Sequence, residues 1–243
     1  MEKQMFENEE AEKSNLYGYG QGFFYRTVFS QWEILKKHFP ELDSLNLDYW
    51  ASVDAGEIRL LRNEENNPVG SWYVFPNWRK HPEVFGRFYP DAVNKIFSVL
   101  PSVRFNSGYK IDGNHLRQTD EFKEFFIYLC KVQGNPDFLI IGAQLGYVWA
   151  NKSFRRAKVL FRPGELGLGV FAARSILLTH PERQTRTDDL GMICGGDEYS
   201  GEGSSDFSSV PKLYKKYSDS KFGANSKSFF AGFMGTVTAF YPV

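Results

Sequence analysis

Residues 110–115, KIDGNH, combine side chains that can do acid-base chemistry. An aspartate and a histidine at this spacing can form an acid-base pair or supply two ligands of a metal, and the asparagine can donate a hydrogen bond beside them. We therefore predict Lys110, Asp112, Asn114 and His115 as catalytic residues. The alternative interpretation is structural, since Asp-Gly-Asn is typical of a turn and His115 then only ties the loop to the helix that follows.

Asp197 and Glu198 are the candidate ligands of a divalent metal. They belong to the sequence GGDEY at 195–199, which resembles the GGDEF turn of diguanylate cyclases, where acidic residues hold divalent metal beside a triphosphate. In that family the turn is flanked by apolar strands, whereas the sequence that follows here, SGEGSSDFSS, is polar. The resemblance is confined to the motif, and a glycine-rich surface loop is the alternative interpretation.

A second glycine motif, at 167–172, fits the GxGxxA pattern, whose glycines admit a pyrophosphate to a helix N-terminus. The same stretch, LGLGVFAARSI, also resembles the opening of SET methyltransferase domains. Residues 162–165, RPGE, interrupt the strand that a dinucleotide fold requires, and the later Asn-His-Ser segment of SET domains is absent from the sequence. We interpret the motif as a tight turn into a helix, where small residues allow close packing.

Arg155, Arg156 and Lys158 form a basic cluster on a helix predicted over 154–161. With the preceding AQLG, the cluster resembles the turn and recognition helix of a helix-turn-helix, where arginines meet phosphates or guanine edges. The register fails, because it places Lys152 at a position that has to be buried. The chain also has 29 Lys+Arg against 29 Asp+Glu. Without net positive charge we do not expect a nucleic-acid partner, and the cluster is interpreted as a solvated helix face.

The candidate catalytic run needs elements that hold it in place. Alternation of apolar and polar residues over 103–111 predicts a strand with one buried face. Thr119 is a predicted N-cap for a helix over 120–129. Residues 110–115 then lie at a strand-to-helix junction, where polar side chains leave the core together and ligand sites are favoured.

Periodicity predicts the remaining elements. Apolar residues at helical spacing indicate helices over 28–39, 90–100, 154–161 and 170–179. Two β-prone runs, 57–62 and 69–75, predict a hairpin, and residues 229–243 have the period of a strand. The run DFLIIGAQLG at 137–146 fits a buried strand or a buried helix. Gly, Ser and Asp dominate 183–225, which predicts a region of long loops.

The composition is that of a folded protein, with 243 residues of which 42% are hydrophobic, 24% charged and 17% aromatic. We predict a single α+β domain over 16–243, with a mixed or antiparallel sheet covered by amphipathic helices. Residues 1–15 are acidic and need not pack on that domain. They lack the apolar run of a signal peptide, so we expect a cytoplasmic protein with reduced cysteines and no membrane partner.

No hydrolase signature such as GxSxG or HExxH, and no phosphate-binding P-loop, occurs in the sequence. We therefore predict a binding or interaction module for a small molecule or a protein. The alternative is an enzyme that acts on a phosphorylated or polar small molecule through Asp112 and His115, with a divalent metal at Asp197 and Glu198. A nucleic-acid-binding protein is the third and weakest alternative.

Overall fold

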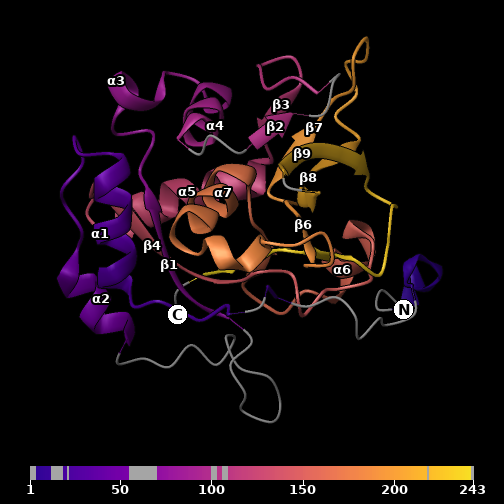
Figure 1. Ribbon diagram of the computed structural model, residues 1–243, viewed down its shortest axis with the longest axis horizontal. Helices are drawn as coiled ribbons and strands as arrows, with labels where there is room; N and C mark the ends of the chain where they lie inside the picture. The colour runs from indigo at the N-terminus through magenta and orange to yellow at the C-terminus, as the bar shows by residue number, and fades with distance from the viewer. Residues whose placement is uncertain are drawn as a thin grey trace.

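Helix α7 (Val170–Thr179) is the element around which the chain packs, and each of its residues is buried. The computed structural model describes residues 4–11, 19–20, 22–54, 70–99, 103–105, 109–217 and 219–241. Within these ranges the predicted fold class is confirmed, because the chain forms a compact α+β domain with an antiparallel sheet and a mixed sheet. Figure 1 shows the helices α1 and α2 at one end and the mixed sheet at the other.

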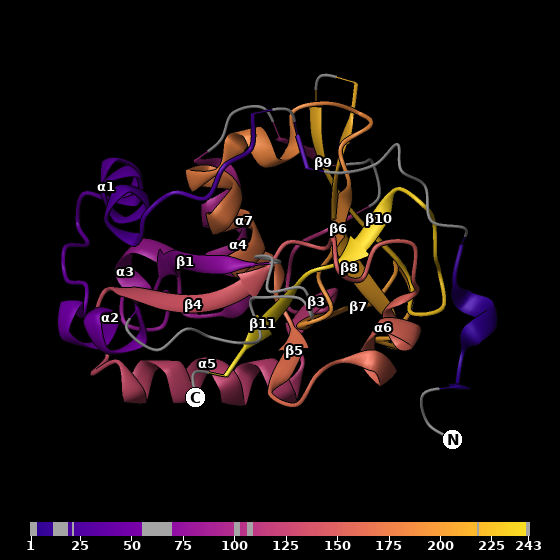
Figure 2. The same cartoon turned by 90° about the horizontal axis from the view of Figure 1, so that it is seen from below.

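The antiparallel sheet has the strand order β1-β4-β11-β5. Its strands are β1 (Ser71–Pro76), β4 (Phe138–Gln144), β5 (Glu165–Gly167) and β11 (Thr238–Phe240). Helix α5 (Asp120–Val132) covers one face, and α1 (Val28–His38) and α7 lie on the other (Figure 2). Because helices cover both faces, every residue of β4 is buried. The run that fits a strand or a helix in isolation is therefore a strand with apolar residues on both sides.

The mixed sheet has the order β10-β6-β8-β7-β3, with β9 paired to β8 and β2 paired to β9. Its strands are β2 (Val103–Phe105), β3 (Leu116–Gln118), β6 (Gly191–Ile193), β7 (Asp197–Tyr199), β8 (Ser209–Lys216), β9 (Asp219–Ser226) and β10 (Met234–Thr236). The region 183–225, predicted as long loops, thus contributes β6, β7, β8 and nearly all of β9, and that prediction is wrong. The polar hairpin β8–β9 is held by cross-strand pairing from Ser209↔Ser226 to Lys216↔Asp219, which no local hydrophobic pattern reveals.

The C-terminal segment joins the two sheets. β10 pairs with β6 in the mixed sheet, and β11 pairs with β4 and β5 in the antiparallel sheet. Only the buried Val237 separates them. The strand period predicted over 229–243 is therefore confirmed within 234–240, but the strand changes sheets at Val237.

Threonine side chains cap two of the helices, and the cap predicted at Thr119 is confirmed. Thr27 before α1 accepts a hydrogen bond from the Ser30 backbone, and Thr119 before α5 accepts one from the Phe122 backbone. The other helices are α2 (Leu47–Asp54), α3 (Pro82–Phe85), α4 (Tyr89–Ser98), α6 (Phe154–Leu160) and the 3-10 turns η2 (Glu7–Glu9) and η4 (Pro181–Gln184). The helices predicted over 28–39, 90–100, 154–161 and 170–179 are confirmed.

Two strand predictions are only partly met. Of the strand predicted over 103–111, β2 covers 103–105, residues 106–108 lie outside the described residues, and residues 109–111 are not in a strand. Of the predicted hairpin, the second run is β1, whereas residues 57–62 lie outside the described residues. β1 pairs antiparallel with β4, which is distant in sequence.

The two glycine motifs pack against each other. A Cβ on Gly196 would lie 2.5 Å from the Gly169 nitrogen and 2.6 Å from the Gly167 oxygen. The Gly196 N–H donates to the Leu168 carbonyl at 3.1 Å. Only glycine permits backbones to approach this closely. Since α7 begins directly after Gly169, the motif at 167–172 is a tight turn into a closely packed helix, as interpreted from sequence.

The acidic N-terminal segment packs on α6 over residues 4–11. Glu9 accepts a hydrogen bond from the Ser153 hydroxyl at 2.5 Å and pairs with Arg155, and Glu10 pairs with Arg156. The Ser153 N–H donates to the Glu9 carbonyl at 3.0 Å. This part of the chain is therefore attached to the domain by ion pairs and backbone hydrogen bonds.

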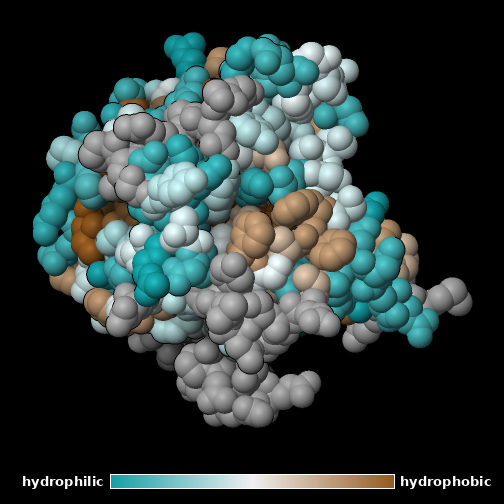
Figure 3. Space-filling model, turned by 45° about the vertical axis from the view of Figure 1, so that its right-hand side comes forward, coloured by the Kyte–Doolittle hydropathy of each residue, from teal (hydrophilic) through white to brown (hydrophobic). Residues whose placement is uncertain are grey.

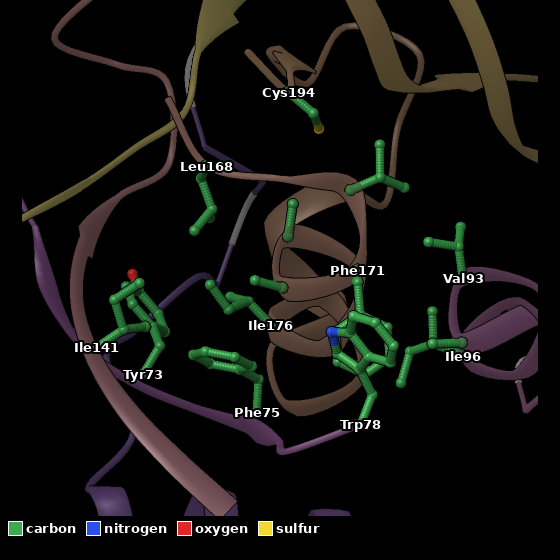
Figure 4. Close-up of a cluster of buried hydrophobic side chains, with 14 of the residues drawn as sticks. Tyr73, Phe75, Trp78, Val93, Ile96, Ile141, Leu168, Phe171, Ile176 and Cys194 are labelled. Carbon is green, nitrogen blue, oxygen red and sulfur yellow. The ribbon is translucent and has the colours of Figure 1, made fainter. Parts of the chain in front are cut away.

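The core surrounds α7. Figure 4 shows Phe171 and Ile176 of α7 among side chains from β1 (Tyr73 and Phe75) and α4 (Ile96). On the face drawn in Figure 3, hydrophilic residues predominate and hydrophobic residues gather in a patch near the centre. None of the helices in the described ranges combines the length and the apolar character that a bilayer crossing requires.

Candidate functional site

Asp112 and His115 form a hydrogen-bonded pair. The His115 Nδ1 atom lies 2.7 Å from Asp112 Oδ1, and the same oxygen accepts the Asn114 backbone N–H at 2.9 Å. The bond from His115 is the main cause that lowers the pKa of the Asp112 carboxyl. With Nδ1 held by the carboxylate, Nε2 is the ring nitrogen left for proton transfer.

The predicted catalytic run is not held together as a whole. Lys110 Nζ pairs with Glu202 at 2.9 Å, and Asn114 is exposed. The turn at 112–115 leads directly into β3, which pairs with β7 and ends just before the Thr119 cap of α5. The expected position before a capped helix is therefore correct, but the turn precedes a short strand and does not follow a long one.

A cavity of about 830 Å³ lies beside this turn, between α4, the N-terminal end of α5 and residues 111–118. We call it the Asp112 cavity. Its volume is within the range of about 300–1,000 Å³ that is typical of ligand sites. Asp112 belongs to its lining, whereas His115 touches Asp112 and is not among the described lining residues. Its aromatic lining residues are Trp78, Phe88 and Tyr89, and its charged or amide ones are Arg79, Arg87, Asp91, Asn94, Asp112, Arg117, Gln118, Asp120 and Lys123.

Two residues of the cavity lining carry a hydrogen-bond donor that has no partner within the described ranges. Trp78 is only 7% exposed, and its indole Nε1 makes no hydrogen bond. The Gln118 Nε2 atom is also buried and unpartnered. More than about 90% of buried polar groups in proteins have a partner, and leaving one unpaired costs about 1–3 kcal/mol. Both residues line the cavity, and a side-chain shift that exposes either donor would let it bind an acceptor on a bound molecule.

The cations of the lining differ in their pairing. Arg117 donates to Glu198 at 2.8 Å, and Arg79 lies 5.9 Å from the centre of the Trp78 ring. Within the described part of the chain, Arg87 and Lys123 have no carboxylate at ion-pair distance. Unpaired cations beside unpaired N–H donors favour a ligand that carries a negative group and several acceptors.

The candidate metal ligands both line another cavity, of about 510 Å³, but each has its own partners. Asp197 Oδ2 accepts from the Val170 backbone and from the Tyr89 hydroxyl, both at 2.6 Å. Glu198 pairs with Arg117 and Lys227. No group of three or more His, Cys, Asp or Glu residues suited to hold a metal occurs in the described ranges. The metal site at Asp197 and Glu198 stays a prediction.

The basic cluster on α6 is neutralised by carboxylates. Arg155 pairs with Glu9, Arg156 with Glu10, and Lys158 with Glu121. Two of these carboxylates come from the acidic N-terminal segment. Cations that are already paired have less to gain from phosphates, so the structure adds no argument for a nucleic-acid partner.

Sequence analysis missed Trp78, Arg87 and Gln118. They come from segments that are far apart in the chain, and none belongs to a motif. The only local signal is the run NWRK at 77–80, in which an aromatic and two basic residues follow a predicted strand. Such a run is common on surfaces, so the lining could only be recognised once the segments were assembled.

Comparison with known proteins gives no relationship, since no protein-family model, no curated protein and no solved structure matches the chain. The site therefore has to be interpreted from its own geometry.

Proposed function

We propose that the protein is a binding module for a small polar molecule that carries an anionic group, and that the Asp112 cavity holds it. The cavity of about 830 Å³ carries this proposal, because its lining includes Trp78, whose buried indole N–H has no partner in the described residues. Arg87 and Lys123 supply cations without carboxylate partners in the described residues, and Phe88, 72% exposed, supplies an apolar surface.

Thermal unfolding with a panel of ligands tests the proposal. The panel contains inorganic phosphate, a sugar phosphate, a nucleoside diphosphate and a dicarboxylate. A ligand present at 100 times its Kd stabilises a protein by about 2.7 kcal/mol, which for this size raises the Tm by about 5–10 °C. Failure of every panel member to raise the Tm counts against the proposal.

Matched variants locate the binding. Trp78→Phe keeps an aromatic side chain but removes the N–H together with the five-membered ring, and it should raise the Kd by about 2- to 10-fold, at least the value of one neutral hydrogen bond. The control is Trp72→Phe, the same change in β1 at a residue that does not line the cavity. Arg87→Gln should weaken binding of anionic ligands, whereas Arg186→Gln, at an exposed arginine paired with Asp188, should not. Equal effects of test and control variants would contradict the location.

An enzyme is the second candidate function, and the Asp112–His115 hydrogen bond of 2.7 Å favours it. A carboxylate that holds Nδ1 fixes the tautomer in which Nε2 accepts a proton, as a general base requires. Each ligand that raises the Tm is incubated with the protein and analysed by mass spectrometry. Conversion by the wild type that is lost in His115→Gln, with binding retained, supports catalysis. If the ligand is unchanged in every incubation, the enzyme candidate is contradicted and only the proposal of a binding module remains.

A further inference from the structure

A separate cavity of about 330 Å³ lies between α7, the turn η4 and the far end of the β8–β9 hairpin. Arg174 of α7 and Lys215 of β8 line it, together with Ser220 of β9 and Gln184 and Thr185 after α7. It has no lining residue in common with the Asp112 cavity among those that the structure describes. Its volume is at the lower end of the range for ligand sites.

Arg174 is a buried cation without a hydrogen-bond or ion-pair partner in the described residues. Its side chain belongs to a residue that is 2% exposed, and its Nε and Nη2 atoms have no hydrogen bond. The guanidinium lies over the Phe97 ring, with Cζ 5.1 Å from the ring centre. That contact supplies no hydrogen-bond acceptor to the Nε and Nη2 atoms. A cation–π contact is weaker than the penalty for burying an unpaired ion.

The other fully buried arginine shows what a structural role looks like in this fold. Arg183 donates to the Leu190 carbonyl at 2.8 Å and to the Leu145 carbonyl at 2.5 Å, and it lies 4.4 Å from the centre of the Tyr19 ring. Arg183 thus ties chain segments together. Arg174 makes no such bond, although burial is the cause that lowers its pKa to about 10 and it stays a cation at neutral pH.

The rest of the described lining contains one further cation, two hydroxyl groups, the amide of Gln184 and the apolar Leu177 and Pro181. Lys215 and Ser220 face each other across the hairpin, and Thr185 adds a second hydroxyl. No aspartate or glutamate is among the described lining residues, so nothing there neutralises Arg174 and Lys215. The Thr185 hydroxyl donates to Asp189 at 3.2 Å, so the two cations and the Ser220 hydroxyl form the donor set for an oxygen anion.

We propose that this cavity is a second ligand site, which binds the phosphate or carboxylate group of a small molecule between Arg174 and Lys215. The guanidinium of Arg174 carries N–H groups without an acceptor in the described residues, and an arginine can bind an oxygen anion through two such groups. Lys215, on a strand at the cavity edge, adds a second charge to the same anion.

The test compares two adjacent lysines of β8. Binding of inorganic phosphate and, in a separate arm, of succinate is measured by calorimetry at constant ionic strength set with chloride. Lys215→Gln should raise the Kd about tenfold or more, the value of a charge-assisted hydrogen bond. Lys216→Gln makes the same charge change at the next residue, which does not line the cavity, and should leave the Kd within twofold. The arm with the lower Kd identifies phosphate or carboxylate as the group bound.

Arg174→Met gives a second, independent readout. Methionine has a similar length and no charge, so the variant should melt above the wild type and lose the stabilisation by the bound anion. If this variant does not fold, the lysine comparison decides. A wild type that binds neither anion, equal effects at Lys215 and Lys216, or an Arg174→Met protein that keeps the full response overturns the proposal. Arg87→Gln, which alters the Asp112 cavity, should leave binding at this site intact, so the two sites fail or succeed separately.

Discussion

Asp197→Asn removes a buried carboxyl whose environment the structure defines. Asp197 is fully buried, its Oδ2 caps α7 through the Val170 N–H and receives the Tyr89 hydroxyl, and its Oδ1 has no partner. Burial is the largest cause and raises the pKa of Asp197 to about 7, although the bonds from Tyr89 and Val170 act in the opposite direction. An asparagine oxygen can accept both bonds, so the cap is retained while the titration is lost.

The expected magnitude follows from the two pKa values. The folded protein binds the Asp197 proton more tightly than the unfolded chain, whose carboxyl has its ordinary pKa of 3.8. The group therefore lowers stability as pH rises from about 4 to 7. Integrated between pH 5 and pH 8, a pKa of about 7 against 3.8 amounts to a loss of about 3 kcal/mol in the wild type. The asparagine variant has no such loss.

Urea denaturation of both proteins at pH 5 and pH 8 measures this difference. All other groups titrate in both proteins and cancel in the comparison, so the variant should gain about 3 kcal/mol relative to the wild type between the two pH values. An offset between the two proteins that is the same at both pH values would refute the reasoning. Melts with Mg²⁺ and Mn²⁺ on the same two proteins test the predicted metal site, because a metal held by Asp197 raises the Tm of the wild type alone.

Gly196→Ala should lower the free energy of unfolding by about 3 kcal/mol or more, because its Cβ would meet backbone atoms at 2.5 Å. The control Gly201→Ala, with open space around it, should change that free energy by less than about 0.5 kcal/mol. Urea denaturation measures both. His180 is buried, and burial is the main cause that lowers its pKa to about 4. Its contribution to the stability of the folded protein is therefore fully present above pH 6.5 and is lost as pH falls toward 4. An NMR titration midpoint of its ring near 6.5 contradicts this. Glu9→Gln weakens the attachment of the N-terminal segment to α6 and should lower the Tm by about 2–8 °C, whereas the exposed Glu7→Gln should leave it unchanged; equal shifts in thermal melts argue against the attachment.

The candidate site was only partly predictable. The Asp112–His115 pair follows from three residues of separation in a turn, a distance that local geometry controls. The cavity beside it does not, since Trp78 follows β1 and Gln118 lies in β3, and only the packing of distant segments brings both to one cavity. The lack of a carboxylate partner for Arg174 could not be predicted either, because the sequence of an apolar helix does not show which distant residues lie near its arginine.

The sequence by itself determined the α+β class and the helices α1, α5, α6 and α7, since capping residues and helical spacing act over a few neighbouring residues. Only the tertiary structure decided that β4 is a strand, because an uninterrupted apolar run is compatible with a strand when helices cover both faces of its sheet. The same holds for the polar β8–β9 hairpin in the region predicted as loops, whose pairing depends on partners outside each strand. Burial and pairing depend on which distant segments meet, and that information is not contained in any local pattern.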